Sequence, residues 1–282
     1  MSSTGVRQTY GPSALGGGGI RRFVELTLTL ARTDFKLRYF GSVLGYVWSL
    51  MRPLLFFGVI YLFFTKIINL SKGIPHYGLY LLTGIVLWNY LGEATGGCVA
   101  CLVQRESMLR KVRFPRMAIP LAVSLTATFN LAMNFITVLV FALASGLTPT
   151  ASWLWLIPIT LGFIVLATGI GMFLSTWYVR FRDVQPIWEV CLQAWFYLSP
   201  IMYAATTYQK HLGVTGARIA MLNPIATMIS QVGHAFIDAS LPSATAVAGV
   251  APVIGAIAII IAVFAIGWWF FTREAPRVAE NL

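Results

Sequence analysis

Long apolar runs separated by short charged stretches make up most of the 282-residue chain. About twenty apolar residues are enough for a helix to cross the hydrocarbon core of a bilayer. Between Met117 and Val179 there is no Asp, Glu, Lys, Arg or His, and this stretch is too long for one crossing, so it must fold back near residues 145–150. The pattern predicts an all-α membrane protein with six transmembrane helices. The predicted spans are residues 43–65, 77–103, 117–145, 153–178, 187–205 and 246–271.

The first forty residues differ from the spans. Residues 1–19 are polar and rich in glycine, which predicts a flexible N-terminus. Residues 20–40 repeat apolar side chains at helical spacing, with charges on the opposite side. This pattern predicts an amphipathic helix in the membrane interface, ahead of a transmembrane domain over residues 41–282. Asp34 and Arg38 lie one turn apart on the apolar side, where they either pair with each other or face partners elsewhere.

The stretch between the fifth and sixth spans is irregular. Residues 219–237 are apolar enough to enter a membrane, but Asn223-Pro224 makes a full crossing unfavourable. Non-helical backbone at membrane depth needs cover from other parts of the protein. We therefore expect a re-entrant helical segment here, and the charge pattern leaves a seventh crossing open. Ser199-Pro200 near the end of the fifth span predicts a bent helix there.

The distribution of cations predicts the orientation. With six spans, both termini lie on the same side of the membrane, and most Lys and Arg residues outside the spans fall on that side. Because Lys and Arg accumulate in cytoplasmic loops, we expect both termini in the cytoplasm and the protein in the plasma (inner) membrane. The cations predicted on the opposite side are Lys66, Lys72, Lys210 and Arg218.

Composition excludes several classes of function. With 58% hydrophobic and 10% charged residues, the chain is far from the composition of soluble proteins. The net charge of +11 is compatible with nucleic-acid binding, but the aromatic residues lie in apolar runs and not in a basic groove, so no nucleic acid is expected. Cys98 and Cys101 have the spacing of metal ligands, but no second ligand pair accompanies them. We interpret them as packing residues and expect no metal.

The sequence also lacks recognisable catalytic groups. There is no G-x-x-x-x-G-K-[ST] phosphate-binding loop, so the chain does not bind ATP in that manner. Asp34, Glu106 and Asp183 are dispersed and do not form an acidic cluster for Mg²⁺. We therefore expect that the chain is not an enzyme and carries no cofactor.

The densest basic cluster lies in residues 104–117, between the second and third spans. It has five cations and one anion, and Phe114-Pro115 adds an apolar side chain and a ring that stops a helix. It is either a docking surface for a partner or a loop whose charges only keep it in the cytoplasm. The candidate docking residues are Arg105, Glu106, Arg110, Lys111, Arg113, Phe114 and Arg116.

A few polar and aromatic residues within the spans are candidates for contact with a substrate. Arg52 lies in the first half of the first span, where it either reaches back to the membrane surface or meets an anionic group. Glu93, near the middle of the second span, needs a partner or water. Trp188 and Trp195 share one face of the fifth span, where they either contact a cargo or pack against lipid and protein.

Several short motifs, taken in order, resemble those of the ABC-2 polysaccharide and polyol-phosphate export permeases, the Wzm-like transmembrane subunits. Together they extend from the amphipathic helix to the region before the last span. The glycine-rich start and alanine-rich spans further resemble the actinobacterial subunit that exports lipid-linked galactan. The motifs are RYFGSVLGYVW at 38–48 with Pro53-Leu54, GIVLW at 84–88 with Glu93, RFPR at 113–116, RDV at 182–184, LSPIMY at 198–203 and LNP at 222–224.

The resemblance implies two copies of this chain bound to two ATP-hydrolysing subunits, which carry the ATP and Mg²⁺. The cargo is a polysaccharide on a polyprenyl-diphosphate carrier, moved out of the cytoplasm among membrane lipids. The basic cluster becomes the element that couples to the ATPase, the amphipathic helix part of the inner gate, and residues 205–240 the outer gate. The expected substrate path contains Trp48, Arg52, Glu93, Trp188, Trp195 and Tyr197. The expected outer gate contains Pro200, Tyr203, Asn223 and Pro224.

Two other functions remain open from the sequence. One is an ABC-2 permease for drugs or small lipids, which has the same architecture and a different cargo. The other is a membrane-embedded glycosyl- or phosphotransferase, which is also basic, aromatic and lipid-linked. No residue pattern identifies the sugar, its length or its terminal modification.

Overall fold

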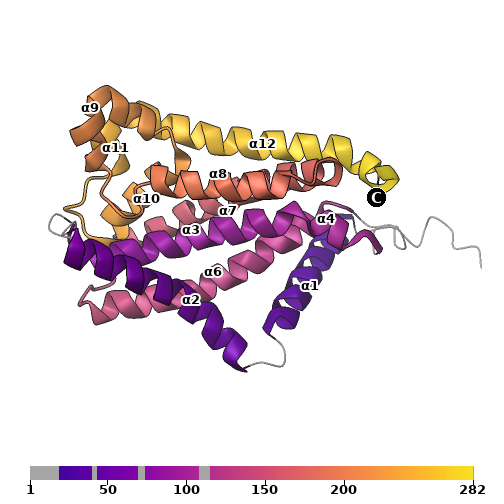
Figure 1. Ribbon diagram of the computed structural model, residues 1–282, viewed down its shortest axis with the longest axis horizontal. Coiled ribbons are helices and arrows are strands. Elements are labelled where there is room, and N and C mark those ends of the chain that lie inside the picture. Colours follow the sequence, from indigo (N-terminus) through magenta and orange to yellow (C-terminus); the bar gives the residue numbers. More distant parts are fainter. Residues whose placement is uncertain (1–18, 40–42, 69–73, 108–114, 282) are drawn as a thin grey trace, which may run out of the picture.

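Every regular element of the described chain is a helix, which confirms the all-α prediction (Figure 1). The structure is a computed structural model that describes residues 19–39, 43–68, 74–107 and 115–281. The flexible N-terminus predicted for residues 1–19 therefore falls, except for Gly19, outside the described residues. The longer helices are α1 (Gly19–Tyr39), α2 (Val43–Leu62), α3 (Tyr77–Val99), α6 (Ala118–Ala144), α7 (Leu156–Arg180), α8 (Val184–Leu198) and α12 (Val250–Asn281).

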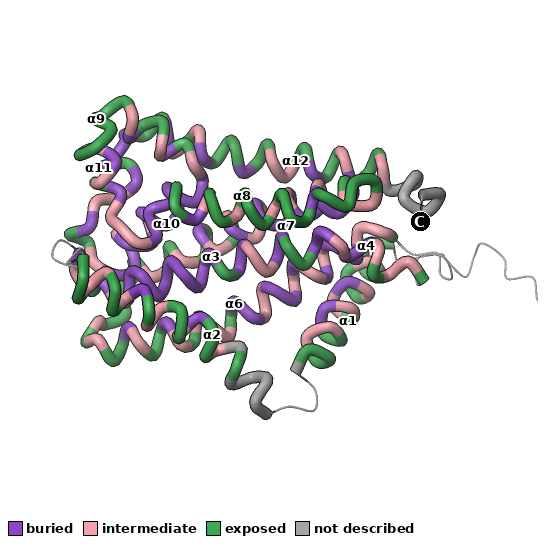
Figure 2. Tube along the Cα trace, in the orientation of Figure 1, coloured by how far each residue is buried: buried purple, intermediate pink, exposed green. Residues whose placement is uncertain are grey.

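Helix α3 is the centre of the bundle. Almost all of its side chains are buried, because it packs against α6, α7 and α8, and α2 contacts it from a further side. In Figure 2 it is a largely purple rod surrounded by helices with exposed outer faces. A helix buried on most sides needs apolar residues on most of its faces, which explains why α3 is largely apolar outside one narrow exposed strip. It ends at Val99, and the short α4 (Cys101–Gln104) leads into the basic cluster.

Helix α1 lies obliquely across α6 (Figure 1). Ala31 is completely buried there, and its carbonyl accepts a hydrogen bond from the Thr126 hydroxyl at 3.3 Å. Phe35 places its ring edge-on to Phe129, with 5.8 Å between the ring centroids. The helix predicted from residues 20–40 is therefore present, with its small and aromatic side chains packed on protein. Its position in a membrane interface stays a prediction.

Close backbone contact joins α7 to α12. A Cβ atom on Gly169 would lie 2.6 Å from the Cα of Phe264, and a Cβ on Gly267 would collide with the Gly169 carbonyl. Small residues let membrane helices approach at this distance, where dispersion contacts replace the hydrophobic effect as the main attraction. These two glycines therefore fix how α12 docks on the bundle.

The chain between α8 and α12 forms one compact end of the molecule. Helix α8 stops at Leu198, and Ser199 is extended, so the predicted bend within a fifth span is instead a helix end ahead of Pro200. The following helices gather where α12 begins (Figure 1), and the axis bends by 110° between α9 and the helix that starts at Pro224. These elements are α9 (Thr206–Ala220), α10 (Pro224–Val232), the π-helix η5 (Gly233–Ile237) and α11 (Ala244–Ala248).

Four helices of the described chain are long and apolar enough to cross a membrane, or five if the bent pair at the compact end forms one span. Helix α3 is long enough, but Asn89, Glu93 and several tyrosines lower its hydropathy, and α8 has only 15 residues. The prediction of six spans counts both α3 and α8 and stays a prediction. The four helical stretches are Leu50–Ile67, Ala118–Ala144, Ala151–Arg180 and Val250–Glu274.

Candidate functional site

The exposed part of α3 is a narrow strip of small and polar residues. Asn89, Gly96 and Gly97 are exposed and Gly92 is half-buried, with half-buried Glu93 beside them, whereas the rest of α3 is buried except for Gly78 near its start. Positions separated by three or four residues share one face of a helix, so these residues form one continuous line. A Cβ on Gly92 or Gly96 would meet no heavy atom within 4 Å, so the space above the strip is open in a single copy of the chain.

A second polar line runs along α8. Gln185, Glu189 and Gln193 follow one another at four-residue spacing and are all exposed, and the Gln185 amide donates to the Glu189 carboxylate at 3.3 Å. Neighbouring positions on the helix, such as Ile187 and Val190, are apolar. Gln and Glu side chains that face hydrocarbon are costly, so this line faces water, a polar ligand or another protein surface.

Two tryptophans fix how α8 is rotated against α3. The Trp188 indole N–H donates to Oγ1 of Thr95 at 3.0 Å, and the Trp195 ring lies 6.3 Å from that of Trp88, so the helices are antiparallel. At 100° per residue, Glu189 lies about 100° from Trp188 and Gly96 lies about 100° from Thr95. When two antiparallel helices face each other through Trp188 and Thr95, these two rotations place Glu189 and Gly96 on the same side of the helix pair.

The two lines of polar residues therefore border one surface, which we name the polar face. It combines the exposed strip of α3 with the exposed stripe of α8, and its residues come from elements about a hundred positions apart in the sequence. The polar face consists of Asn89, Gly92, Gly96, Gln185, Glu189 and Gln193.

The residues predicted to form the substrate path fall into two groups. Trp188 and Trp195 turn inward and use their indole N–H groups in hydrogen bonds within the chain. Tyr197 and Trp48 are exposed, with 62% and 63% of their surfaces accessible, and Arg52 is exposed on α2. The structure thus brings Trp188 and Trp195 together on α3 and leaves the other three facing outward. Their contact with a substrate stays a prediction.

Glu93 is paired, as a carboxylate within a predicted span requires. Its Oε1 accepts hydrogen bonds from the Arg38 guanidinium on α1 and from the Asn130 amide on α6. The pair is partly open, with 46% of the Arg38 side chain and 31% of the Glu93 side chain accessible. Glu93 borders the polar face, so this three-residue contact lies between α1 and the face.

A second ion pair starts from the same helix. Asp34, one turn before Arg38, accepts from the Arg105 guanidinium, which follows α4 at the start of the basic cluster. Asp34 and Arg38 therefore face partners on other elements, which answers the alternative that the sequence left open. Both partners of this pair are mostly buried, and within the described residues Nη1 of Arg105 has no hydrogen-bond partner.

The basic cluster itself is described in part. Arg105, Glu106 and Arg116 are half-buried, and Pro115 is exposed. The prediction that the cluster docks a partner rests largely on four residues that lie outside the described ones, and it stays a prediction. Those residues are Arg110, Lys111, Arg113 and Phe114.

Tyrosine hydroxyls support the irregular segment after α8. Tyr77 donates to the Met202 carbonyl at 2.9 Å, Tyr80 to the Pro200 carbonyl, and Tyr208 to the Leu198 carbonyl at 2.6 Å. These carbonyls lack the donors that a continuing helix supplies, and unpaired carbonyls at membrane depth are costly. Sequence analysis missed these three tyrosines. Pro200 was the signal in the sequence that could have indicated them. A proline ends a helix, and a helix that ends inside an apolar region leaves backbone carbonyls that need hydrogen-bond donors such as tyrosine hydroxyls.

Asn223 connects the irregular segment to α10. Its Oδ1 accepts from the backbone N–H of Ile225 at 3.1 Å, as a helix N-cap does, and from the Trp195 indole at 3.0 Å. Its amide donates to the Ser199 hydroxyl at 3.1 Å. Pro224 is buried in the first turn of α10, where its missing N–H costs nothing. The structure thus brings Asn223, Pro224 and Pro200 of the predicted outer gate to one place.

Tyr203, the remaining residue of the predicted outer gate, belongs to the same network. Its hydroxyl donates to the Tyr197 carbonyl at 3.0 Å, and its carbonyl accepts from Tyr80 at 3.2 Å. Farther along the compact end, the backbone N–H of Ser240 donates to Asp238 at 2.8 Å, and this hydrogen bond lowers the pKa of the Asp238 carboxyl.

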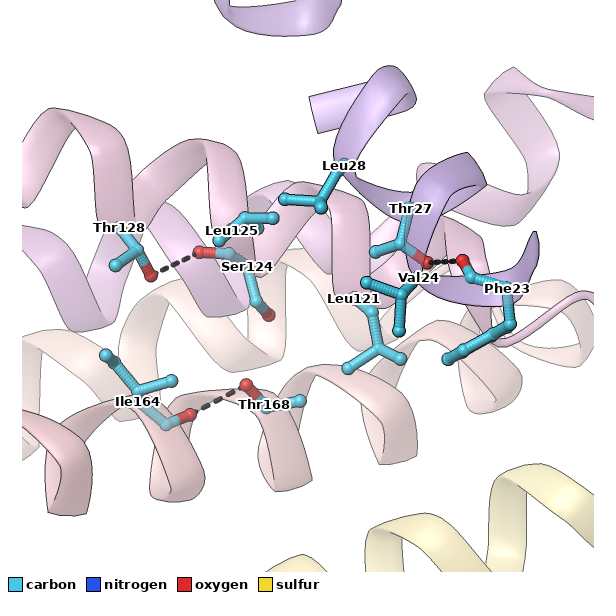
Figure 3. Close-up of a pocket in the computed structure, with 10 residues that line it drawn as sticks. All are labelled: Phe23, Val24, Thr27, Leu28, Leu121, Ser124, Leu125, Thr128, Ile164 and Thr168. Carbon is cyan, nitrogen blue, oxygen red and sulfur yellow. Dashed lines mark hydrogen bonds between the residues drawn. The ribbon is translucent and has the colours of Figure 1, made fainter. Parts of the chain in front are cut away.

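A groove of about 330 Å³ lies between α1, α6 and α7 (Figure 3). The hydroxyl groups of its three threonines donate to carbonyls of their own helices: Thr27 to Phe23, Thr128 to Ser124 and Thr168 to Ile164. The lining is mostly aliphatic side chains and the Phe23 ring, and it contains no charged residue. Its lining consists of Phe23, Val24, Thr27, Leu28, Leu121, Ser124, Leu125, Thr128, Ile164 and Thr168.

The described residues contain no cluster of three or more His, Cys, Asp or Glu side chains that could hold a metal ion. Cys98, near the end of α3, and Cys101, at the start of α4, are both buried, and a Cβ on Gly171 would lie 2.8 Å from the Cys98 sulfur. The Cys98 thiol thus fills the contact between α3 and α7.

Comparison with known proteins gives a family and several relatives. Residues 25–237 match the ABC-2 type transporter family. The chain is 29% identical over 218 residues to an O-antigen export system permease protein, RfbA, of Klebsiella pneumoniae, which covers 77% of this chain and 82% of the relative. It is also 29% identical over 221 residues to the O-antigen export system permease protein RfbA of Myxococcus xanthus, covering 78% of this chain and 83% of the relative.

Proposed function

Because this chain belongs to the ABC-2 type transporter family, we propose that it is the membrane subunit of a polysaccharide exporter. Its cargo is a polysaccharide of the O-antigen, teichoic acid or galactan type, carried on a polyprenyl diphosphate and moved from the cytoplasm across the plasma membrane. ATP hydrolysis takes place on a separate subunit that holds the ATP and Mg²⁺, and this chain has no enzymatic activity of its own. The identity to two O-antigen export permeases over most of the chain supports this choice of cargo.

The polar face is the observation that carries the proposal. Amide groups donate and accept hydrogen bonds and carboxylates accept them, so both can pair with sugar hydroxyls, which donate and accept. The glycines of α3 leave room for a chain to lie close to the backbone. A drug-like or lipid cargo does not need a continuous line of polar groups along a helix. The polar face therefore supports a hydroxyl-rich polymer over the small apolar cargoes of other ABC-2 permeases.

The lipid carrier needs a different surface. The groove between α1, α6 and α7 has an apolar lining that suits an isoprenoid chain (Figure 3). The diphosphate of the carrier needs cations, and exposed Arg52 on α2 is available for it. In this arrangement the sugar and the lipid travel along separate surfaces of the same chain.

A complete path requires two copies of the chain. In one copy the polar face is open, and polar groups of this kind are not stable against lipid. Two copies that bring their polar faces together enclose a polar passage. This arrangement uses six spans, among them α3 and α8, with both termini in the cytoplasm and residues 219–237 re-entering from the outer side.

The basic cluster of residues 104–117 faces the ATPase in this topology, since the loop between the second and third spans is cytoplasmic. Two ATPase subunits then bind the two copies, and Arg113 and Phe114 dock in them. The ion pair between Arg105 and Asp34 holds the start of this cluster to α1.

Transport in vesicles tests the proposal. Vesicles that contain the chain, its ATPase subunit and a polyprenyl-diphosphate-linked polysaccharide should protect the polymer on the far side only when ATP is hydrolysed. Gln193→Leu, on the polar face, should lower this export by about tenfold, as expected for the loss of favourable hydrogen bonds of about 1.4 kcal/mol. Ile187→Leu, at an exposed apolar position about 120° around the same helix from Gln193, is the matched control.

Three results would decide against the proposal. Transport of a small amphiphile in place of the polymer would favour the permease for drugs or lipids. Turnover of a nucleotide sugar by the purified chain would favour the transferase. Equal export by Gln193→Leu and Ile187→Leu would remove the polar face from the path.

A further inference from the structure

Helix α9 turns a sharp corner that leaves aliphatic side chains exposed (Figure 2). Gly213 lies at the corner with a φ of 70°, a backbone conformation that favours glycine. A Cβ on Gly216 would lie 2.4 Å from the Cβ of Leu212, so the two halves of the helix approach closely there. Leu212 and Val214, on either side of the glycine, have 58% and 60% of their surfaces accessible. The corner thus presents apolar side chains that the rest of the described chain leaves uncovered.

The second half of α9 lies beside the start of α12. Ile219 is exposed, and so is Leu222, whose side chain lies against α12: a Cβ on Gly255 would be 2.6 Å from it. Val250 and Ile254, in the first turns of α12, are exposed as well. Helix α12 is long and apolar enough to cross a membrane, so its exposed side chains face acyl chains there. The exposed apolar residues of α9 therefore lie next to a helix surface that faces lipid.

Two cations accompany the apolar residues of α9. Lys210 and Arg218 are exposed, and no ion pair within the described residues includes either of them. The sequence has no Asp or Glu between Glu189 and Asp238, so α9 and α10 carry no anion. Asp238 is the one acid of the compact end, and it accepts a hydrogen bond from the backbone N–H of Ser240. The compact end therefore has a net positive charge, and α9 holds both its Lys and its Arg.

Membrane orientation does not explain these two cations. In the proposed topology α9 lies outside the cytoplasm, where Lys and Arg are usually scarce. A helix with exposed aliphatic side chains and cations fits a membrane surface, because the aliphatic groups enter the boundary of the acyl chains while the cations attract anionic headgroups. A second copy of this chain is a poorer partner, since a symmetric contact through α9 would bring the same cations together. The polar face of α3 and α8 is, moreover, the surface proposed for that copy.

We propose that α9 binds anionic phospholipids of the membrane through Lys210 and Arg218. The two cations contact the phosphate groups of the lipid headgroups, and the exposed aliphatic side chains of the helix lie against the upper parts of the acyl chains. Bound lipid then holds the compact end at a fixed depth beside α12. This inference goes beyond the proposed function and is independent of the cargo. The aliphatic side chains are Leu212, Val214, Ile219 and Leu222.

Quenching by brominated lipids tests this binding. Bimane is attached to Ile219→Cys in a full-length chain with Cys191→Ser, and the protein is placed in phosphatidylcholine vesicles that contain increasing amounts of one brominated lipid. Each Lys or Arg near an anionic membrane surface contributes about a fivefold preference for it. Half-maximal quenching should therefore require at least about fivefold less brominated phosphatidylglycerol than brominated phosphatidylcholine.

The chain provides its own controls. Lys210→Gln with Arg218→Gln should make the two lipids equally effective at this position, because the remaining apolar residues do not distinguish between headgroups. Lys66→Gln with Arg21→Gln removes two exposed cations from other helices and should leave the preference unchanged. Bimane at Ile261→Cys, an exposed position in the middle of the apolar part of α12, should be quenched equally by both lipids in every variant. Quenching there also shows that each variant is inserted in the membrane.

The outcomes separate this inference from the proposed function. A preference for phosphatidylglycerol at Ile219 that disappears in the Lys210 and Arg218 double variant supports the lipid contact, even if the vesicles export no polysaccharide. Equal quenching by both lipids before these cations are replaced overturns it, and so does the absence of quenching by either lipid, which would mean that protein covers α9. The contact is also overturned if the double variant keeps the preference, or if the control pair loses it.

Discussion

The indole N–H of Trp195 donates to Oδ1 of Asn223 at 3.0 Å and joins α8 to the start of α10. The same amide side chain caps α10 and donates to Ser199, so three elements meet at one residue. This contact places Asn223 at the junction between the helix that carries the polar stripe and the compact end of the molecule.

Asn223→Ala should destabilise this junction. It removes an N-cap, worth about 1 kcal/mol, and two further hydrogen bonds, so we expect a loss of about 2–3 kcal/mol. Unfolding of the purified protein in detergent, followed by tryptophan fluorescence, measures this change. Asn223→Asp keeps the acceptors for Ile225 and Trp195 and should lose less than half as much. Equal losses for the two variants would show that the acceptors are unimportant.

Gly169→Leu should separate α12 from α7. A side chain at this position meets the backbone of Phe264, which cannot rotate away, and forced overpacking costs about 1–3 kcal/mol or more. Lower yield of folded protein and a lower thermal midpoint are the expected results. Gly58→Ala is the control, since a Cβ on Gly58 meets no heavy atom within 4 Å and alanine favours a helix. A stable Gly169→Leu protein would contradict the close approach of the two helices.

Labelling with a membrane-impermeant maleimide tests the topology of residues 219–237. Cysteines placed at Lys210 and at Ser240, both exposed, should react from outside the cell in a chain whose exposed Cys191 is replaced by serine. A re-entrant segment returns to the side from which it came, which is why both positions should react alike. Reaction of Ser240→Cys from the cytoplasmic side alone would establish a seventh crossing.

Substitutions of Arg52 distinguish between two roles for a cation in the first half of a span. If it binds the diphosphate of the carrier, Arg52→Ala should reduce export more than Arg52→Lys, because lysine keeps the charge. If it only reaches the membrane surface, both variants should export alike, since lysine does the same and alanine is tolerated in a span. Export normalised to the amount of permease in the vesicles distinguishes these roles.

The sequence by itself determined where the helices lie. Apolar runs at helical spacing placed α1, α2, α6 and α7 to within a few residues, because the period of an α-helix is a local property of the chain. Proline also acts locally: Pro200 stops α8, and Pro224 starts α10. The order of short motifs indicated the ABC-2 family, which the match over residues 25–237 shows.

Only the tertiary structure decided which faces of those helices meet. Glu93 and Asp34 needed partners from the outset, but Arg38 and Arg105 lie 55 and 71 positions away from them, and many cations of the sequence were eligible. Selection among eligible partners depends on how helices pack, and packing is set by contacts such as that of Gly169 with Phe264, which no local pattern reveals.

The same limit applies to the polar face and the tyrosine network. Gln185 and Asn89 are unremarkable polar residues in the sequence, and they share a surface only because Trp188 bonds to Thr95 and fixes the rotation of α8. Tyr77 and Tyr80 belong to the predicted second span, and their hydroxyls acquire a role only beside the carbonyls after α8. A side chain's position on its own helix is set by the local period, whereas its neighbours are set by the packing of the whole bundle.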